Sequence, residues 1–265
     1  MKNKIFALIA VTLFSLSSFA QMQSINASNN QQQTNNGKKE ASTSDLNLKG
    51  EGTEEKPYLL TYPEDLFALA SFCSQGNGSS LEGKVFKLTR NIIFNSGEAG
   101  DTITLDGINA SNFIPIGGVQ RVQITAVTMN NHSTIYKYSP INDDDYSFRG
   151  ILDGGGYCIK NLHVRRKTTG SAGNNDEYNR YCGLFGRIKN TTIKDLVIAN
   201  STFSAYRCVG AFAGTIYNIG TDASTNTIDN CASVNNILNG QGQVGSFVGS
   251  GGRYGKNNSN YSPIP

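Results

Sequence analysis

Tryptophan is absent from the 265 residues, and histidine occurs only at His132 and His163. Neither histidine belongs to a His-Glu-x-x-His pair of zinc ligands, so a metallopeptidase centre of that kind is excluded. Charged residues make up 16% of the chain, and 23 basic residues nearly balance 20 acidic ones. This balance gives no indication of a nucleic-acid partner. The sequence predicts no catalytic constellation, no metal site and no cofactor.

Long hydrophobic runs are also missing. The run from Ile5 to Leu13 is too short for a membrane-spanning helix, which needs roughly 20 apolar residues. It follows Lys2 and Lys4 and precedes Ser18-Phe19-Ala20, the pattern of a signal peptide over residues 1–20. The first cysteine is Cys73, which argues against a lipid anchor at the new N-terminus. We expect an exported protein without a membrane span, located in the periplasm, on the outer surface or outside the cell.

Residues 21–49 are rich in Gln, Asn and Ser and poor in large apolar residues. Such a segment buries too little surface to offset its ordering entropy, so it is interpreted as a disordered spacer. Order is expected from Gly50 onward. A short strand at Tyr58 to Leu60 should lead into a helix with Thr61 as its N-cap and Pro63 in its first turn. The helix should end at Gly76-Asn77-Gly78.

Two short motifs alternate from Phe148 onward. The first is Ile159-Lys-Asn161-Leu162-His-Val164, and it recurs from Ile193 and from Ile228 at intervals of 34 and 35 residues. The second is a glycine-phenylalanine box that begins at Cys182, Val209 and Val244, at intervals of 27 and 35 residues. Repeats of this length with strand-like pieces and glycine turns favour a β-solenoid over an α-solenoid or a propeller.

The predicted fold class is therefore all-β, a right-handed parallel β-helix with a short N-terminal capping helix. The helix would cover the apolar side chains and open backbone groups of the first coil. Stacked coils align equivalent residues into ladders. The expected apolar ladders are Ile159 with Ile193 and Ile228, and Leu162 with Leu196 and Cys231. Asn161, Asp195 and Asn230 would form a structural polar ladder at a bend, where small polar side chains bond to the backbone.

An irregular insertion near residues 118–147 interrupts the repeats. Strand-like pieces from Val122 to Met129 and from Thr134 to Tyr138 predict a hairpin that projects from the solenoid. Tyr136 and Tyr138 on this hairpin, with Asp143, Asp144 and Asp145 beside it, are the candidate ligand-binding residues. Two interpretations remain open for them, a site for a sugar or peptide and an ordinary exposed strand with a solvated loop.

Five cysteines in an exported chain leave at least one thiol unpaired. The repeat alignment favours cysteines packed as small hydrophobes over disulfides. It also places Cys182 and Cys208 on opposite faces of a strand, which disfavours a bond between them.

These elements together resemble the GLUG-motif family of bacterial secreted and surface proteins. The resemblance rests on GEGTEEKPYLL with its helix, KVFKLTRNI, FIPIGG, FRGILDGGGYCIKNLHV, and the CGLFG, VGAFAG and VGSFVG boxes, and it covers residues 50–252. It implies an adhesin-like or structural module. Similar repeats accompany immunoglobulin-A-specific metallo-endopeptidases, where they lie outside the catalytic part. The chain departs from the family pattern at Phe113, at Tyr157 and in the insertion.

Two alternatives to a non-catalytic binding or structural module stay open. One is a carbohydrate-active enzyme on the same fold, suggested only by the Arg187-Ile188-Lys189 string that polygalacturonases share; paired aspartates and a Gly-His-Gly string are missing. The other is an accessory N-terminal part of a longer surface protein or protease, because residues 253–265 form a polar tail that resembles a truncated repeat. The expected partner is a host or microbial surface glycan or protein.

Overall fold

The computed structural model describes residues 43–94, 103–105, 108–118, 120–124, 134–139, 146–166, 180–218 and 225–253. The predicted signal peptide and nearly all of the predicted spacer and tail lie outside these residues. Short strands dominate the described residues, so the chain is all-β. Within the described ranges, helical structure is limited to η1 (Thr43–Leu46), α2 (Pro63–Cys73) and η2 (Gly78–Leu81).

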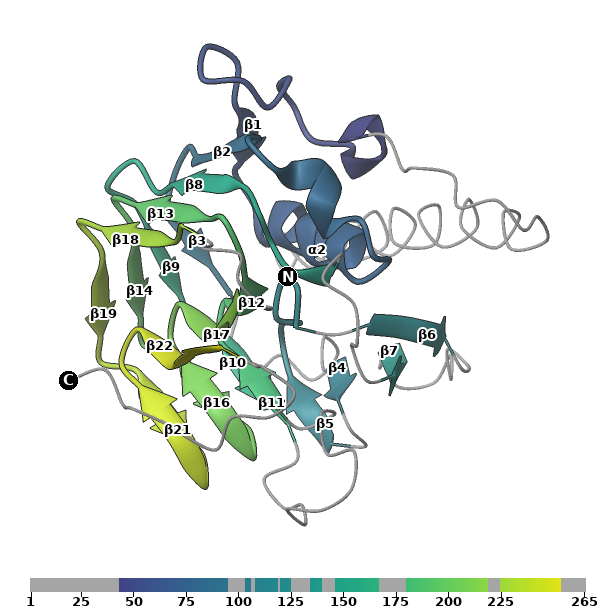
Figure 1. The fold of residues 1–265 in the computed structure, drawn as a ribbon, viewed down its shortest axis with the longest axis vertical. Helices are drawn as coiled ribbons and strands as arrows, with labels where there is room; N and C mark the ends of the chain where they lie inside the picture. The colour runs from purple at the N-terminus through teal and green to yellow at the C-terminus, as the bar shows by residue number, and fades with distance from the viewer. Residues whose placement is uncertain are drawn as a thin grey trace, which may run out of the picture. The chain divides into compact units, whose positions relative to one another are not determined.

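Five sheets contain only parallel strands, and their strands stack side by side (Figure 1). Sheet 1 consists of β1 (Tyr58–Leu60), β2 (Val85–Leu88), β8 (Ile151–Asp153), β13 (Thr192–Lys194) and β18 (Thr227–Asp229). Sheet 2 consists of β3 (Ile92–Ile93), β9 (Cys158–Lys160), β14 (Val197–Ala199) and β19 (Ala232–Val234). Sheet 3 consists of β10 (His163–Arg165), β15 (Thr202–Ser204) and β20 (Ile237–Asn239). Sheet 4 consists of β11 (Arg180–Cys182), β16 (Arg207–Gly210) and β21 (Gly242–Gly245). Sheet 5 consists of β12 (Phe185–Ile188), β17 (Ala213–Asn218) and β22 (Val248–Arg253).

The chain visits these five sheets in the same order three times. We call the three passes set 1 (β8–β12), set 2 (β13–β17) and set 3 (β18–β22). Every strand of set 2 pairs with its equivalent in set 3 at a register of 35 residues, from Thr192 with Thr227 to Ala213 with Val248. The constant register means that the two sets trace the same path and that each set supplies one strand to every sheet.

The corners between strands use the left-handed backbone region. Asn200 and Asn235 lie level at one corner with φ of 51° and 52°, and the Asn235 amide donates to Asn200 Oδ1 at 2.9 Å. Asn is among the few non-glycine residues that adopt this conformation readily, because its short side chain bonds locally. At the preceding corner Asn230 donates to Asp195 Oδ1 at 2.5 Å.

The predicted ladder of Asn161, Asp195 and Asn230 is therefore wrong for Asn161. Asn161 directly follows β9, and β9 pairs with β14, so Asn161 is level with Asn200 and lies one corner further along the path than Asp195. All three residues do occupy bends with positive φ. The motif misleads because successive corners of set 2 are similar, with Asp195 two residues after Ile193 and Asn200 two residues after Ile198.

The predicted apolar ladders need the same correction. Ile193 pairs with Ile228, as expected, but its other neighbour is Leu152. Ile159 instead pairs with Ile198 in sheet 2. Leu162 is likewise level with Ser201, whose hydroxyl accepts the Leu162 N–H at 3.0 Å, while Leu196 and Cys231 share a corner. The glycine-phenylalanine boxes align as expected, with Cys182 paired to Val209 and Val209 to Val244.

One apolar core runs through the stacked sheets. It contains an aromatic column in which Tyr58 contacts Phe86, Phe86 contacts Phe148, and Phe148 stacks on Phe185 with ring centroids 4.6 Å apart. The strands are only two to six residues long, so hydrogen bonding within any one pair is limited. Burial of these inward residues is the main favourable contribution to stability.

The segment before set 1 begins earlier than the sequence indicated. η1 precedes the expected boundary at Gly50, and its Leu46 is 2% exposed in the core. The helix α2 buries Leu66, Leu69 and Cys73. Its N-cap is Tyr62, one residue after the expected Thr61, because the Asp65 carboxylate accepts the backbone N–H groups of both residues at 2.7 and 2.9 Å.

Charges of alternating sign cross sheet 1 on one face. Lys87, Asp153, Lys194 and Asp229 lie level with one another on β2, β8, β13 and β18. The Asp153 carboxylate is 3.9 Å from Lys87 Nζ and 3.7 Å from Lys194 Nζ. We call these four residues the charge ladder. Opposite charges directly across neighbouring strands stabilise a register, and like charges destabilise it.

Reversing the central charge of this ladder should lower stability. Asp153→Lys places three cations in line, and we expect the free energy of unfolding to fall by about 1 to 2 kcal/mol, since exposed lysines are screened by solvent. Asp153→Asn, which removes attraction without adding repulsion, should lose about 0.5 kcal/mol. Urea denaturation at low and high salt measures both. Equal losses for the two variants, unaffected by salt, would contradict an electrostatic role.

Candidate functional site

The predicted hairpin is present as a strand pair in a sixth, mixed sheet. This sheet has the order β5 (Ile108–Ser111), β4 (Ile103–Leu105), β7 (Thr134–Ser139) and β6 (Gln120–Ile124). β6 and β7 are antiparallel, with Tyr136 level with Ile124 and Tyr138 level with Arg121. The first strand is earlier than the expected Val122 to Met129. Asp143, Asp144 and Asp145 lie outside the described residues.

The sixth sheet is joined to the stacked sheets through the segment that follows β4. Ser111 Oγ accepts the backbone N–H of Arg165 at 2.9 Å and donates to the Arg165 carbonyl at 3.1 Å. The neighbouring Asn112 side chain accepts from the His163 N–H at 2.6 Å. β5 therefore continues beside β10, so the strand that carries Tyr136 and Tyr138 belongs to a sheet bonded to set 1.

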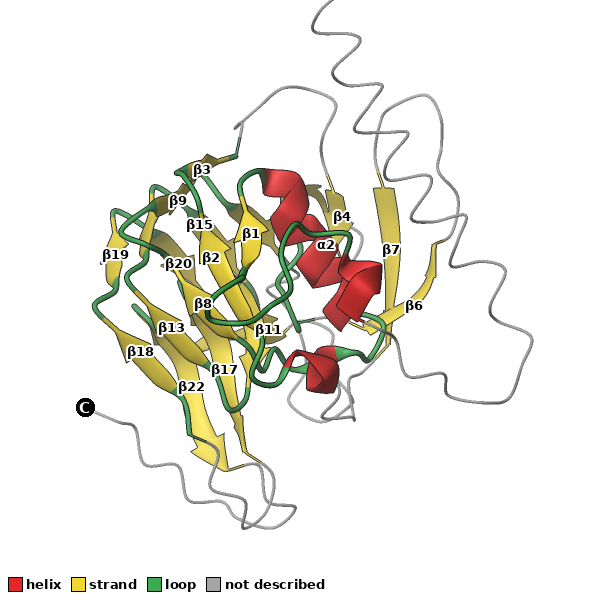
Figure 2. Cartoon of the chain, turned by 90° about the horizontal axis from the view of Figure 1, so that it is seen from above, coloured by secondary structure: helices red, strands yellow, loops and turns green. Residues whose placement is uncertain are grey.

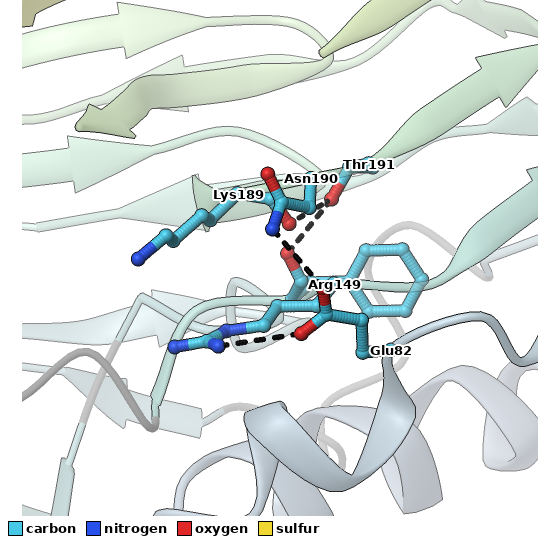
Figure 3. A network of polar contacts seen from close by, with 6 residues as sticks. Glu82, Arg149, Lys189, Asn190 and Thr191 are labelled. Carbon is cyan, nitrogen blue, oxygen red and sulfur yellow. Dashed lines mark hydrogen bonds and ion pairs between the residues drawn. The ribbon is translucent and has the colours of Figure 1, made fainter. Parts of the chain in front are cut away.

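A polar network lies where the chain enters sheet 1 (Figure 3). The Glu82 carboxylate accepts from the Asn190 amide at 3.1 Å and is 3.6 Å from Arg149 Nη1. Thr191 Oγ1 donates to backbone carbonyls, at 2.8 Å to that of Phe148. Glu82 is the one carboxylate of this network, whereas glycoside hydrolysis by the usual route needs two. The network ties the segments that precede β2, β8 and β13 to one another.

Buried cations near β11 and β12 are a feature that the sequence did not reveal. The Arg187 guanidinium lies between the rings of Tyr181 and Tyr217, at 4.5 and 4.6 Å from their centroids. Arg166 donates to the carbonyls of Gly118 and Arg180. Arg187 and Arg166 are 1% and 2% exposed. Burial withdraws Arg187 from solvent, so the Arg-Ile-Lys string does not present its guanidinium to a polysaccharide at the surface.

All five cysteines are free thiols in the structure. Cys182 and Cys208 lie in adjacent strands but out of register, since Cys182 pairs with Val209. Cys208 Sγ instead contacts Gln243 Oε1 at 3.1 Å. Burial raises the pKa of Cys73, at the end of α2, far above the usual thiol range. Cys73 therefore stays protonated and acts as a small core residue.

This shift predicts a loss of stability in alkali. The folded-state pKa of Cys73 is raised, so its contribution is fully present below the ordinary thiol pKa of about 9 and is lost as pH rises beyond it, when only the unfolded chain ionises. We expect a slope of about 1.4 kcal/mol per pH unit from this residue above pH 9. Denaturation of the native chain and of Cys73→Ala between pH 7 and 10.5 measures it. The same slope in both proteins would contradict the assignment.

The outer edge of set 3 is the most apolar exposed surface of the described residues. Val234, Ile237, Val244 and Phe247 are between 38% and 64% exposed. Three of their equivalents in set 2, Ala199, Val209 and Phe212, are buried, and Thr202, level with Ile237, is partly buried. Within the described chain no strand pairs with the far side of set 3. We call this surface, formed by β18–β22, the set 3 edge.

The described part of the chain contains no group of three or more His, Cys, Asp and Glu side chains arranged to hold a metal ion. None of its helices combines the length and the apolar character that a membrane crossing needs.

Comparison with known proteins gives one similarity. The chain is 25% identical over 201 residues to halomucin of Haloquadratum walsbyi, a match that covers 76% of this chain. The chain spans about 2% of the length of that curated relative. No family model matches the chain, and no solved structure matches it.

Proposed function

We propose that the chain is an exported, non-catalytic β-solenoid module of the GLUG type that binds or assembles with surface polymers or proteins outside the cell. The observation that carries this proposal is the fivefold path of sets 2 and 3, in which every strand repeats at 35 residues. Stacked units of this kind offer long, regular surfaces for binding, and each unit buries its apolar face against its neighbours.

The coil is proposed to be right-handed, since connections between parallel strands of one sheet nearly always have that hand. The helix α2 would then be the N-terminal cap. It follows β1, which is the first strand of sheet 1, and its buried Leu66 and Leu69 join the same core as Phe86. Figure 2 shows α2 beside β1 and β2. A helix in this place shields the first coil from pairing with other chains.

Two lines of support favour binding over catalysis. The polar network around Glu82 holds a single carboxylate, and Arg187 is sequestered between two tyrosine rings. Similarity to a short stretch of halomucin fits a module that occurs within larger chains. Export is inferred from residues 1–20, where the charged start and short apolar run have the features of a signal peptide.

Binding of the mature chain to arrays of surface glycans and proteins tests this function. We expect the double variant Tyr136→Ala with Tyr138→Ala to weaken binding about tenfold, since an aromatic contact with a ligand contributes about 0.5 to 1.5 kcal/mol. Tyr62→Ala is the matched control, because Tyr62 is 56% exposed and is not part of the sixth sheet.

The enzymatic alternative is tested with the same preparation. Incubation with acidic polysaccharides and calcium should release neither unsaturated nor reducing ends. Release of either product would overturn the proposal of a non-catalytic module. Binding that survives the double tyrosine variant would instead move the site away from the hairpin.

A further inference from the structure

We propose that the set 3 edge is a docking surface for a β-strand segment of another polypeptide that carries a basic residue level with Asp229. This inference goes beyond the proposed function, because the edge is separate from Tyr136 and Tyr138. It rests on the charge ladder, on the composition of set 3, and on the exposure of its inward residues.

The charge ladder alternates along sheet 1 and stops on an acid. Asp153 lies level with Lys87 on one side and with Lys194 on the other. Lys194 in turn lies level with Asp229 on β18, where the ladder ends. Asp229 is exposed, and β18 is the last strand of the sheet within the described chain. The next strand in this alternation carries a cation beside Asp229 and an apolar residue over Ile228.

The rest of the edge carries one further charge, Arg253 at the end of β22. Between Thr225 and Gly252, Asp229 is the single charged residue in the sequence. Strand edges that face solvent permanently are protected by lysines, prolines or bulges. An edge with little such protection, whose inward Val244 and Phe247 are 44% and 38% exposed, is built to be paired. Its neutrality also selects against strongly charged partners such as nucleic acid.

Asparagine side chains along the edge add a second recognition element. The Asn235 amide donates to Asn200 Oδ1, and the Asn235 side chain is exposed to solvent. An incoming asparagine at the same corner continues this ladder, since an amide offers both donors and acceptors. The partner strand that pairs with β18 therefore carries an apolar residue followed by a lysine. At the corner level with Asn235 the partner carries an asparagine.

The chain supplies its own probe for this docking mode. A peptide with the sequence of Asn190–Ser204 covers β13, β14 and β15 and presents Ile193, Lys194 and Asn200 at the required positions. Asp195→Asn is included in the peptide, because Asp195 would bring two acceptors together opposite Asn230. The matched control peptide differs only by Lys194→Asp. Strand addition to an exposed sheet edge is a known mode of peptide recognition.

Titration of both peptides into the full chain, followed by fluorescence polarisation, tests the proposal. We expect the lysine peptide to bind about tenfold more tightly than the aspartate peptide, because attraction at Asp229 is replaced by repulsion. In Asp229→Lys the preference should reverse. A reversal would show that residue 194 of the peptide lies level with residue 229 of the chain, whatever the overall affinity.

Several outcomes would overturn the proposal. Equal binding of both peptides, no binding of either, or an unchanged preference in Asp229→Lys each contradicts it. Sedimentation that shows a dimer broken by Ile237→Lys would assign the edge to a second copy. Peptide binding that appears only after removal of residues 254–265 would assign it to the chain's own C-terminal segment. Glycan or protein binding that persists in these cases leaves the proposed function intact, so the two failures are distinguishable.

Discussion

Alanine at Gly210 is expected to prevent stable folding or to lower the free energy of unfolding by at least about 3 kcal/mol. Gly210 ends β16 inside the second glycine-phenylalanine box. A Cβ at this position would collide with the Ala213 carbonyl oxygen and would lie 2.7 Å from both Gly249 N and the Phe247 carbonyl oxygen. All three are backbone atoms, so no side-chain rotation relieves the overlap.

The matched control for this glycine is Gly242→Ala. Gly242 also lies in sheet 4, on β21, but a Cβ there would meet only the Arg207 side chain at 3.8 Å, an ordinary contact. We expect a change of less than about 1 kcal/mol, partly offset by the lower entropy of the unfolded chain. Circular dichroism and urea denaturation of the two variants measure the difference. Similar stabilities would contradict the close approach of strands at the boxes.

Truncation of the box phenylalanines should have effects that depend on their set. Phe212 in set 2 is fully buried and stacks on Phe247, with ring centroids 5.1 Å apart. Phe212→Ala should lower the free energy of unfolding by about 3 to 5 kcal/mol, the usual cost of removing a core aromatic ring. Phe247 occupies the equivalent position in set 3 but is 38% exposed.

Phe247→Ala is accordingly expected to cost about 1 kcal/mol, because much of its ring already contacts water. The two variants are matched in residue type and in position within the repeat, so the comparison isolates burial. Chemical denaturation of both, at concentrations that span a hundredfold, is the measurement. An equal loss for Phe247 would mean that the set 3 edge is covered in solution.

The sequence was most informative where one residue type meets one backbone requirement. The glycine-phenylalanine boxes predicted the alignment of Cys182, Val209 and Val244 correctly, because glycine is required where two backbones approach. The bends at Asn161, Asp195 and Asn230 were also indicated by their residue types.

The register of the first motif was not predictable in the same way. Between β8 and β9 the chain has the longer Gly154–Tyr157 connection, whereas β13 and β14 are joined by Asp195 and Leu196. Ile159 lies on β9 in sheet 2, whereas Ile193 lies on β13 in sheet 1, and similar motifs at successive corners conceal this difference. Backbone pairing resolves the ambiguity, and a single sequence contains no record of that pairing.

The candidate site shows the same limit. Tyr136 and Tyr138 could be assigned to a hairpin from local turn and strand signals, and the paired strands β6 and β7 contain this segment. The parallel pairing of β7 with β4 joins residues far apart in sequence and has no local signal. The enclosure of Arg187 by Tyr181 and Tyr217 likewise depends on contacts between adjacent sets. An isolated arginine in a strand gives no indication of such burial.

Methyl nuclear Overhauser spectroscopy of the isoleucine-labelled chain tests the proposed coil most directly. Stacked strands about 4.8 Å apart predict strong cross-peaks between Ile159 and Ile198 and between Ile193 and Ile228. Observation of both would establish that strands of successive sets pair in the register described. Absence of both cross-peaks, with the two pairs of methyl groups assigned, would contradict the coil.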